Sequence, residues 1–506
     1  MASLSSRLIP ADFTPAPSLL PERVIDFDAV TAFSPDLDAI GFAVTTDGEV
    51  DAALGLDRAA LARAGFEGKP GQSLLIATVD GPVVFAVGAG AAGELTADTV
   101  RDIAATFARA ASSHARIGLS LSVVGAVAPE SVGQVVAEGT LLARYRYSEL
   151  KSEPKVTALT AVELRVEGAE TSGVTAGIPR GVVAARSANL ARDLANTPPG
   201  YLTATDFADL ALSLAETFGL DVEVFDKQQL IDLGCGGLLG VNAGSAEEPR
   251  MIKIGYTPNG EPTGHVALVG KGIMYDSGGI SLKPSDPMHL AMKMDMGGAA
   301  AVFAALTALR DLSSTTAVTA FLMCTDNMPS GSAYKLGDVL TARGGTTVEV
   351  KNTDAEGRLV MMDGLALAVE EQPDAIVDIA TLTGAALVSL GPATAALFGN
   401  DQALVEQAKA ASAATDEQLW QLPLEKKYRK QLDSDVADLS NLGGPYAGAT
   451  TAALFLNEFV AGLPWAHIDI AGTMQSAADD SWRSKGATGF GARLLIDFLL
   501  GFRRVR

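Results

Sequence analysis

Short runs of β-branched and other apolar residues alternate with Ala-rich stretches along most of this chain. Apolar runs of about four to eight residues are typical of buried strands, and longer Ala-rich stretches are typical of helices. In the second half, Gly298–Leu312 and Thr450–Val460 predict helices that pack closely on a sheet. The predicted strands there are Val222–Phe225, Met251–Tyr256, Val266–Val269, Thr316–Met323, Ala375–Ile379 and Ala466–Ile470. Since the alternation continues unbroken from Asp221 to Phe502, we expect one large α/β domain.

The N-terminal part shows the same alternation on a smaller scale. From Val24 to about Val166 it predicts a second α/β domain. Residues 1–24 contain three prolines by Pro17 and no sustained apolar segment, so we expect a flexible or surface-draped arm. The predicted elements of the domain are the strands Ser73–Val79, Val83–Val87 and Ile117–Val124 and the helix Thr99–Ser112.

A segment rich in Gly, Thr and Ser, Glu167–Gly181, separates the two parts, and we interpret it as the domain boundary or a crossing over it. A helix is predicted over Val182–Leu194, and Asn196–Gly200 (NTPPG) ends it. We therefore expect a smaller N-terminal domain over residues 1–175 and a larger domain over residues 176–506.

Composition and charge narrow the class of protein. The chain has 38 Lys and Arg against 60 Asp and Glu, a net charge of −22, which repels phosphate backbones and anionic membranes. We therefore expect no nucleic acid as a general partner, although a local basic patch is left open. No apolar stretch approaches the ~20 residues of a membrane span, and the N-terminus does not read as a signal peptide. Two cysteines, Cys235 and Cys324, fit a reducing compartment, so we expect a cytoplasmic protein with no membrane contact.

One Gly-rich motif suggests a different chemistry. The predicted strand Val83–Val87 continues into GAGAAG at Gly88–Gly93, the G-x-G-x-x-G pattern of dinucleotide-binding oxidoreductases. Such a site also requires an acidic residue about twenty positions later. Because Ala111–Gly118 contains no carboxylate, we interpret the motif as a tight turn between a strand and a helix.

The charged residues that are candidates for a functional site follow predicted strands, and ligand sites of α/β sheets lie at such strand ends. After the predicted strand Thr346–Val350, a turn carries Asp354, Glu356 and Arg358 at a spacing of two residues, and a helix is predicted from Arg358 onward. In an extended turn these side chains project to one side, and adjacent carboxylates require a proton, a cation or water to offset their repulsion. Other segments add Lys271, Asp276, Lys283 and Asp295.

Four carboxylates from three such segments suit hard divalent cations, and we expect two ions. The types of donor atom do not distinguish between Zn²⁺, Mn²⁺ and Mg²⁺. The alternative is an ordinary set of surface charges at loop ends.

Taken in order, several stretches resemble the leucyl aminopeptidase (cytosol aminopeptidase) family. They are KGIMYDSGGISLKP, KMDMGGAAAV, DNMPSGSAYKLGDVLT, NTDAEGRLV, DIATLTGA and WAHIDIAGT, and NTDAEGRL at Asn352–Leu359 is the signature of that family. The resemblance extends over about residues 190–495. It implies a macro-like N-terminal α/β domain used in assembly. It also implies a larger catalytic α/β domain whose central, mostly parallel or mixed sheet is flanked by helices.

The resemblance also implies an activity. The protein would be a metallo-exopeptidase that removes the N-terminal residue, preferably leucine-like, from short peptides, with a metal-bound water as nucleophile. It would assemble as a homo-hexamer, a dimer of trimers with the active sites facing an inner cavity.

Individual roles follow from the same resemblance. Asp276 and Glu356 would bridge two ions, Asp354 would bind the tighter-held ion, and Lys271 and Asp295 would complete the second site. A lysine that binds a metal must lose its proton, so Lys271 must have its pKa lowered. The remaining assignments are Lys283 as donor to the oxyanion, Arg358 as holder of a bicarbonate ion that acts as general base, Thr381, Leu382 and Gly384 as substrate-lining residues, and Met292 and Met294 as neighbours of that pocket.

The chain departs from the family pattern near the site. Tyr275 stands where the family has Phe, and one extra residue lies between Lys283 and Asp295, in PSDPMHLAMKM. This leaves the shape of the local loop open. We expect His289, within that loop, to be a surface residue and His467, within a strand, to be structural.

Two other classes of protein fit the sequence less well than an aminopeptidase. A phosphoesterase would also use two metals, but no phosphate-binding loop is present. A DNA-binding or regulatory protein conflicts with the net charge of −22.

Overall fold

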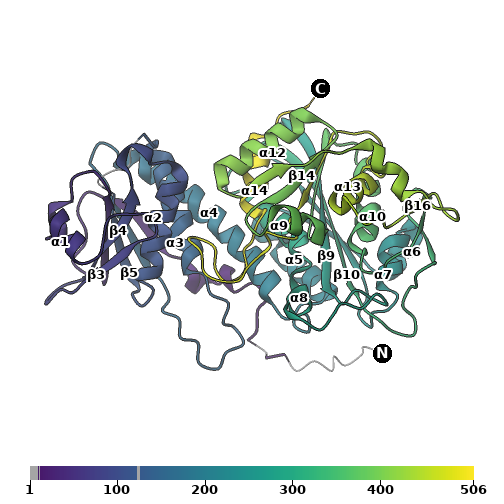
Figure 1. Cartoon of the computed structure of the whole chain (residues 1–506), viewed down its shortest axis with the longest axis horizontal. Coiled ribbons are helices and arrows are strands. Elements are labelled where there is room, and N and C mark those ends of the chain that lie inside the picture. Colours follow the sequence, from purple (N-terminus) through teal and green to yellow (C-terminus); the bar gives the residue numbers. More distant parts are fainter. Residues whose placement is uncertain (1–8, 11, 122–125, 506) are drawn as a thin grey trace. The chain divides into compact units, whose positions relative to one another are not determined.

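The computed structural model describes residues 9–10, 12–121 and 126–505 (Figure 1). The chain forms two compact units. The N-terminal unit comprises Ala16–Asn189 with the returning segment Ser476–Gly486. The C-terminal unit comprises Leu190–Gln475 and Ala487–Arg506, together with the described residues up to Pro15. Of the predicted N-terminal arm, residues 1–8 and 11 lie outside the described part of the chain.

The N-terminal unit is built on a six-stranded sheet in the order β1-β6-β5-β2-β4-β3. All neighbouring strands are parallel except β3, which pairs antiparallel with β4. The predicted strand at 83–87 and the predicted helix at 99–112 are confirmed. The strand predicted over Ser73–Val79 is confirmed as far as Ile76. The strand predicted over Ile117–Val124 is confirmed as far as Ser120, and residues 122–124 of it are outside the described residues. The bounds are β1 (Asp26–Val30), β2 (Ala39–Thr45), β3 (Ser73–Ile76), β4 (Val83–Gly90), β5 (Arg116–Ser120), β6 (Ala161–Arg165), α1 (Arg58–Arg63), α2 (Ala97–Ala110) and α3 (Pro129–Arg144).

The GAGAAG motif is a close backbone crossing. A Cβ added at Gly88 would lie 1.9 Å from the main-chain oxygen of Lys69, and Gly90 has a φ of +79°. Both positions therefore require glycine. The last glycine, Gly93, lies within a 3-10 turn, Ala92–Glu94, and α2 begins only at Ala97, so no α-helix begins at the motif as a dinucleotide site would need.

The Gly-rich segment Glu167–Gly181 was interpreted as the domain boundary or a crossing over it, and the helix after it was predicted to begin only at Val182. Helix α4 (Thr171–Asn196) begins within it and continues across residue 175. The reason is helix packing: a Cβ on Gly177 would lie 1.8 Å from the main-chain oxygen of Glu130 in α3, and one on Gly181 would lie 2.2 Å from that of Gln134. Glycines four residues apart let two helix backbones approach closely. The predicted boundary at 175/176 stays a prediction.

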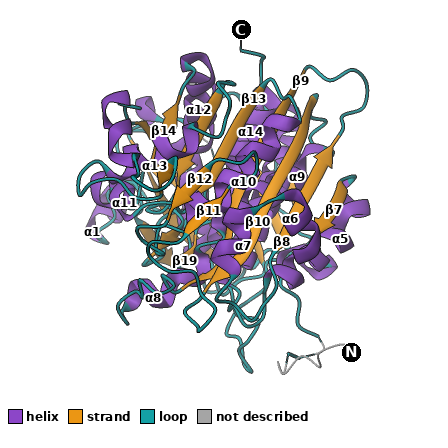
Figure 2. Cartoon of the chain, turned by 90° about the vertical axis from the view of Figure 1, so that its right-hand side faces the viewer, coloured by secondary structure: helices purple, strands orange, loops and turns teal. Residues whose placement is uncertain are grey.

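The C-terminal unit contains an eight-stranded mixed sheet in the order β15-β14-β17-β13-β9-β10-β8-β7, with helices packed around it (Figure 2). Its central strands β17, β13, β9 and β10 are parallel, whereas β8 and β14 run antiparallel to their neighbours β10 and β17. Thus the predicted two-part α/β fold is confirmed. The strands are β7 (Asp221–Phe225), β8 (Arg250–Tyr256), β9 (Gly264–Asp276), β10 (Thr316–Asn327), β13 (Ala375–Ala380), β14 (Ala395–Gly399), β15 (Leu419–Gln421) and β17 (Trp465–Asp469).

The close packing of helix α9 on the sheet explains why its sequence is so rich in alanine. Every residue of α9 is buried, and a Cβ on Gly298 would lie 2.1 Å from the main-chain oxygen of Ile379 in β13. Small residues therefore allow the helix to lie directly on the sheet. The helices are α5 (Ala204–Phe218), α6 (Lys227–Leu233), α7 (Gly236–Asn242), α8 (Pro287–Ala291), α9 (Gly297–Leu309), α10 (Gly357–Glu370), α11 (Gly384–Leu390), α12 (Gln402–Thr415), α13 (Gly448–Asn457) and α14 (Ala492–Gly501).

Two small sheets complete the fold, β11 (Val339–Thr341) with β12 (Thr347–Glu349) and β16 (Leu439–Ser440), and β18 (Gln475–Ser476) with β19 (Gly486–Ala487). Among the described residues, Pro287–Leu309 is the single helical stretch long and apolar enough to cross a membrane, and 78% of its most apolar window is buried inside the protein. It therefore reads as core.

Strands β9 and β10 are longer than their apolar patterns predicted. They were expected to end at Val269 and Met323, but they pair in parallel as far as Asp276 and Asn327, with a bulge after Thr325. The glycines and polar residues of GKGIMYD interrupt the apolar run without ending the strand, because this part of β9 is buried between neighbours. As a result, Lys271 lies within the strand, and Asp276 is its last residue.

Candidate active site

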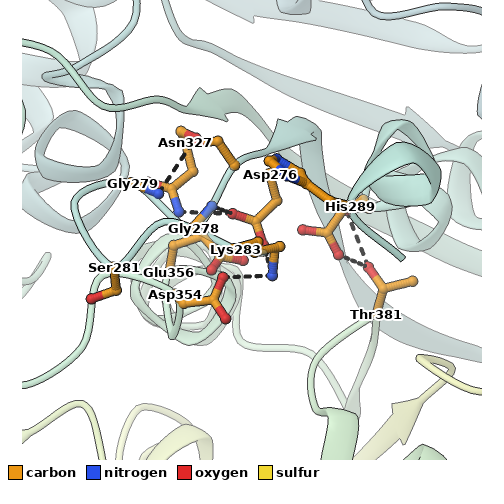
Figure 3. A network of polar contacts seen from close by, with 12 residues as sticks. Asp276, Gly278, Gly279, Ser281, Lys283, His289, Asn327, Asp354, Glu356 and Thr381 are labelled. Atoms are coloured by element: carbon orange, nitrogen blue, oxygen red, sulfur yellow. Dashed lines mark hydrogen bonds and ion pairs between the residues drawn. The ribbon is translucent and has the colours of Figure 1, made fainter. Parts of the chain in front are cut away.

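Four carboxylates and two lysines meet at the carboxyl edge of the central strands. The ammonium of Lys271 lies 2.8 Å from Asp295 Oδ2 and 2.7 Å from Glu356 Oε1. That of Lys283 lies 2.8 Å from Asp276 Oδ2 and 2.5 Å from Asp354 Oδ1. Figure 3 shows Asp276, Lys283, Asp354 and Glu356 directed toward one another. All six residues that the sequence singled out for the metal and oxyanion roles therefore belong to one cluster.

The local fold explains this convergence. Asp276 ends β9, Asp295 follows a 3-10 turn just before α9, and Glu356 is the residue from which α10 begins. Lys283 returns to the cluster because Gly278 and Gly279 turn the chain with φ values of +86° and +64°. A Cβ on Gly278 would lie 2.8 Å from Asp354 Oδ1, so this turn also needs glycine to fit against the carboxylate.

Burial and mutual repulsion perturb the titration of the cluster. Burial, followed by the charge of Asp276, raises the pKa of Glu356 to about 8. Burial also raises the pKa of Asp295 to about 6, although Lys271 opposes the shift. For Lys271 itself, burial lowers the pKa, but the charges of Asp295 and Glu356 outweigh burial and raise it above its ordinary value. The cluster thus retains protons that a bound cation would displace.

The donor set fits divalent cations. Asp276, Asp354 and Glu356 each offer a carboxylate oxygen, and these oxygens lie within 4.8 Å of one another. Among the described residues, Glu356 Oε2 is buried and has no hydrogen-bond partner. A buried carboxylate oxygen without a partner is costly unless a cation approaches it. The four carboxylates also outnumber the two ammonium groups, and oxygen donors are those that Mg²⁺ and Mn²⁺ prefer.

Arg358 belongs to the first turn of α10 and not to the extended turn in which it was predicted. The sequence also predicted a helix from Arg358 onward, and that helix is confirmed, beginning one residue earlier at Gly357. Its guanidinium is buried and donates from Nη1 to the main-chain oxygen of Asn441 at 2.8 Å, whereas Nε has no partner among the described residues. Burial lowers the pKa of Arg358 to about 10, against the opposing charge of Glu356. Arg358 therefore presents an unused buried donor.

A cavity of about 210 Å³ opens onto the cluster. Thr381 joins its wall to the cluster, since its main-chain oxygen accepts from Lys271 at 2.8 Å and its hydroxyl donates to Asp295 Oδ1 at 2.6 Å. The predicted lining residues thus do face the same cavity as the carboxylates. The wall includes Thr381, Leu382, Gly384, Met288, Met292, Met294, Leu387 and Met474.

Two family models match the chain: the catalytic domain of the cytosol aminopeptidase family over residues 189–496 and the N-terminal domain of that family over residues 43–154. The chain belongs to the cytosol aminopeptidase family. It is therefore a metal-dependent aminopeptidase, a hydrolase, as its resemblance implied.

Relatives of known sequence and structure agree with this assignment. The probable cytosol aminopeptidase of Alkaliphilus metalliredigens is 42% identical over 443 residues, which are 85% of this chain and 88% of that protein. That of Chlorobaculum tepidum is 45% identical over 385 residues, which are 74% and 76% of the two chains. The solved structure of the bottromycin maturation enzyme BotP is 41% identical, with a TM-score of 0.83, and covers 92% of this chain and 99% of its own. The same enzyme in complex with Mn gives a TM-score of 0.84.

The structure adds residues around the site of this aminopeptidase that sequence reasoning did not assign. Asn327 donates to Asp276 Oδ1 at 2.8 Å and to the main-chain oxygen of Thr353 at 2.9 Å. Asp469 accepts from the main-chain nitrogen of Leu382 at 3.1 Å and from the hydroxyl of Thr383 at 2.6 Å. These side chains hold ligand-bearing and cavity-lining loops. Both fall within the family-like stretches, which is the signal that could have found them.

His289 and His467 differ in their surroundings. His467 is fully buried, its Nδ1 lies 2.6 Å from Asp378 Oδ1, and its ring stacks between Trp465 and Phe398. This is a structural environment, as expected of a strand residue. His289 is half-buried rather than a free surface residue, and its ring stacks on Tyr275 at 5.8 Å between centroids. The altered loop is thus packed against the strand that ends in Asp276.

Proposed function

We propose that this chain is a two-metal leucyl aminopeptidase that removes leucine-like residues from the N-termini of short peptides. The observation that carries this proposal is the arrangement of four carboxylates and Lys271 around one edge of a substrate-sized cavity. Membership of the family supports the exopeptidase reaction. The apolar side chains on the wall, among them Leu382, Leu387 and Met294, support a preference for apolar side chains.

The proposed ligands follow from the donor set. Asp276 and Glu356, at the centre of the cluster, would be shared by two ions; Asp354 would serve one ion, and Lys271 with Asp295 the other. The unpartnered oxygen of Glu356 supports its place between them. The ions would be Mn²⁺, Zn²⁺ or Mg²⁺, and the Mn complex of BotP supports the first.

When bound, two divalent ions supply Lewis-acid activation of water and of the scissile carbonyl. The residues of the chain supply the rest. Lys283 has its pKa raised, because Asp276 and Glu356 outweigh the effect of burial, so it carries a proton at neutral pH and can donate to the oxyanion. Arg358, with its free Nε, would hold an anion such as bicarbonate that accepts the proton of the attacking water. Thr381, Leu382 and Gly384 would orient the substrate side chain.

We further propose that the protein works in the cytoplasm and assembles as a hexamer of two trimers. The name of its relatives supports the compartment, and the presence of the family's N-terminal domain supports the assembly. Size-exclusion chromatography with light scattering would measure the oligomeric state directly.

The experiment that tests the function is hydrolysis of leucine amide before and after removal of metal with a chelator, followed by addition of Mn²⁺ or Zn²⁺. Asp354→Asn is measured beside it. Asp338→Asn is the control, since Asp338 forms an ion pair with Lys335 at 3.4 Å and lies outside the cluster. We expect activity to disappear with chelator, to return with metal, and to be absent in Asp354→Asn alone.

Metal-restored protein that cleaves no N-terminal residue would contradict the proposal. Hydrolysis of a phosphate ester in its place would identify a different two-metal hydrolase.

A further inference from the structure

Asn441 contacts the turn that carries two of the four carboxylates through both ends of its side chain. Its Oδ1 accepts from the main-chain nitrogens of Lys351 at 2.8 Å and of Asn352 at 3.3 Å. Its Nδ2 donates to the main-chain oxygens of Asn352 at 2.7 Å and of Ala355 at 3.3 Å. One amide side chain thus occupies four main-chain groups of the segment from Lys351 to Ala355.

The main chain of Asn441 adds two further contacts. Its nitrogen donates to the main-chain oxygen of Glu349 at 3.0 Å, and its oxygen accepts from Arg358 Nη1 at 2.8 Å. Asn441 therefore touches the last residue of β12, the carboxylate-bearing turn and the first turn of α10. These are the three consecutive parts of the NTDAEGR region.

The topology explains why a side chain is needed here. Strand β16 pairs in parallel with β12, Leu439 with Val348 and Ser440 with Glu349, and the pairing ends there. The turn that follows belongs to no helix or sheet, so its main-chain groups lack regular partners. Asn441 is fully buried, which leaves no solvent to replace it. Buried main-chain groups must be hydrogen-bonded, and a side-chain amide supplies both a donor and an acceptor for this purpose.

We propose that Asn441 is a positioning residue that preorganises the Asn352–Glu356 turn for metal binding. The inference rests on the proposed two-metal function. Asp354 lies within the turn that Asn441 fixes and Glu356 ends it, and Arg358 is tied to the same residue, so loss of Asn441 frees the ligands and the guanidinium together. Outer residues that orient metal ligands typically contribute 10–100-fold to affinity or activity.

The test compares Asn441→Ala and Asn441→Asp with Asn400→Ala. Asn400 is the matched control because its amide also joins two segments, with Oδ1 accepting from the nitrogen of Trp465 at 2.8 Å and Nδ2 donating to the oxygen of Leu463 at 3.0 Å. It follows β14, which is antiparallel to β17, and therefore lies at the opposite edge of the sheet from the carboxylates. Asn441→Asp keeps the acceptor and the size of the side chain but removes the two donated bonds.

Mn²⁺ affinity is measured on metal-free protein by electron paramagnetic resonance of the free ion, beside amide hydrogen exchange of residues 348–360 and steady-state kinetics at saturating Mn²⁺. We expect both Asn441 variants to weaken Mn²⁺ binding about 10–100-fold, to exchange faster in the turn, and to lose kcat more than they change KM. Asn400→Ala should lower only thermal stability.

Asn441 variants that bind Mn²⁺ and turn over as Asn400→Ala does would overturn the inference, and Asn441→Asp decides the matter if Asn441→Ala does not fold. The two proposals fail separately. A wild-type protein that binds Mn²⁺ but hydrolyses no peptide amide defeats the proposed function, while its Mn²⁺ titration still tests Asn441.

Discussion

Lys283→Met separates two roles that the structure allows for this lysine. Lys283 contacts Asp276 and Asp354, so it balances the charge of two proposed metal ligands as well as facing the cavity. If it donates to the oxyanion, its removal should lower kcat about 10²–10³-fold, or about 3–4 kcal/mol of transition-state stabilisation. Removal should not weaken metal binding, because unit charges about 4 Å apart interact by ~4 kcal/mol at an effective dielectric constant of 20, and the lost ammonium repels the cations.

The assay is cleavage of leucine p-nitroanilide over a titration of Mn²⁺, which yields kcat and the apparent Mn²⁺ affinity from one data set. Lys253→Met is the control, since Lys253 is also ion-paired, with Glu371 at 2.5 Å, but lies on β8 outside the cavity. We expect normal kinetics for the control, and a large loss of kcat without loss of Mn²⁺ affinity for Lys283→Met. A Lys283→Met enzyme with wild-type kcat at saturating Mn²⁺ would refute the oxyanion role and leave charge balance as the function of this lysine.

Two further predictions concern the fold. Gly177→Ala should lower the unfolding temperature, because the added methyl meets the main-chain oxygen of Glu130 at 1.8 Å and overpacking of ~1–3 kcal/mol exceeds the ~1 kcal/mol gained in helix propensity. Gly501→Ala, where the methyl meets open space, should not, and equal behaviour of the two would contradict close packing of α4. Burial raises the pKa of Asp326 to about 6, above the ~3.9 of an aspartate in an unfolded chain. The protonated form therefore stabilises the fold below pH ~4, and up to about 3 kcal/mol of this stability is lost as the pH rises through 6. Asp326→Asn should flatten that part of the stability–pH curve of the metal-free protein, and an unchanged slope would show that Asp326 does not cause it.

The sequence predicted the fold best where one apolar pattern determined one element. Strand β13 and helix α2 were found because a short β-branched run and an Ala-rich amphipathic pattern act locally. The errors arise where packing against distant parts of the chain determines the secondary structure. Glycines 173, 177 and 181 read as a loop, yet they form the face of α4 that lies against α3. Likewise, β9 continues through Gly270 and Gly272 because neighbouring strands and α9 enclose it, which no property of the strand itself reveals.

The candidate site could be predicted in composition but not in detail. Asp276 ends a central parallel strand, so its position follows from the α/β rule. Asp354 follows β12, which belongs to the separate three-stranded sheet, so that rule alone does not bring it to the cluster. The helix predicted from Arg358 onward begins one residue earlier, at Gly357, since the start of α10 depends on how the turn before it is held. Helix boundaries shift by a residue or two with such contacts.

Asn441 shows why the supporting residues escape sequence reasoning. A metal ligand is recognisable because its chemistry is unusual in a strand end, whereas an asparagine that bonds the backbone of a segment some 85–90 residues away has no pattern of its own. Its effect is nevertheless concentrated, because four of its bonds fall on the segment from Lys351 to Ala355, which carries one ligand and leads directly into the next. A shift of about 1 Å in such a turn is enough to lower a rate 10²-fold. The precision of this site therefore depends on residues outside the signature as much as on the signature itself.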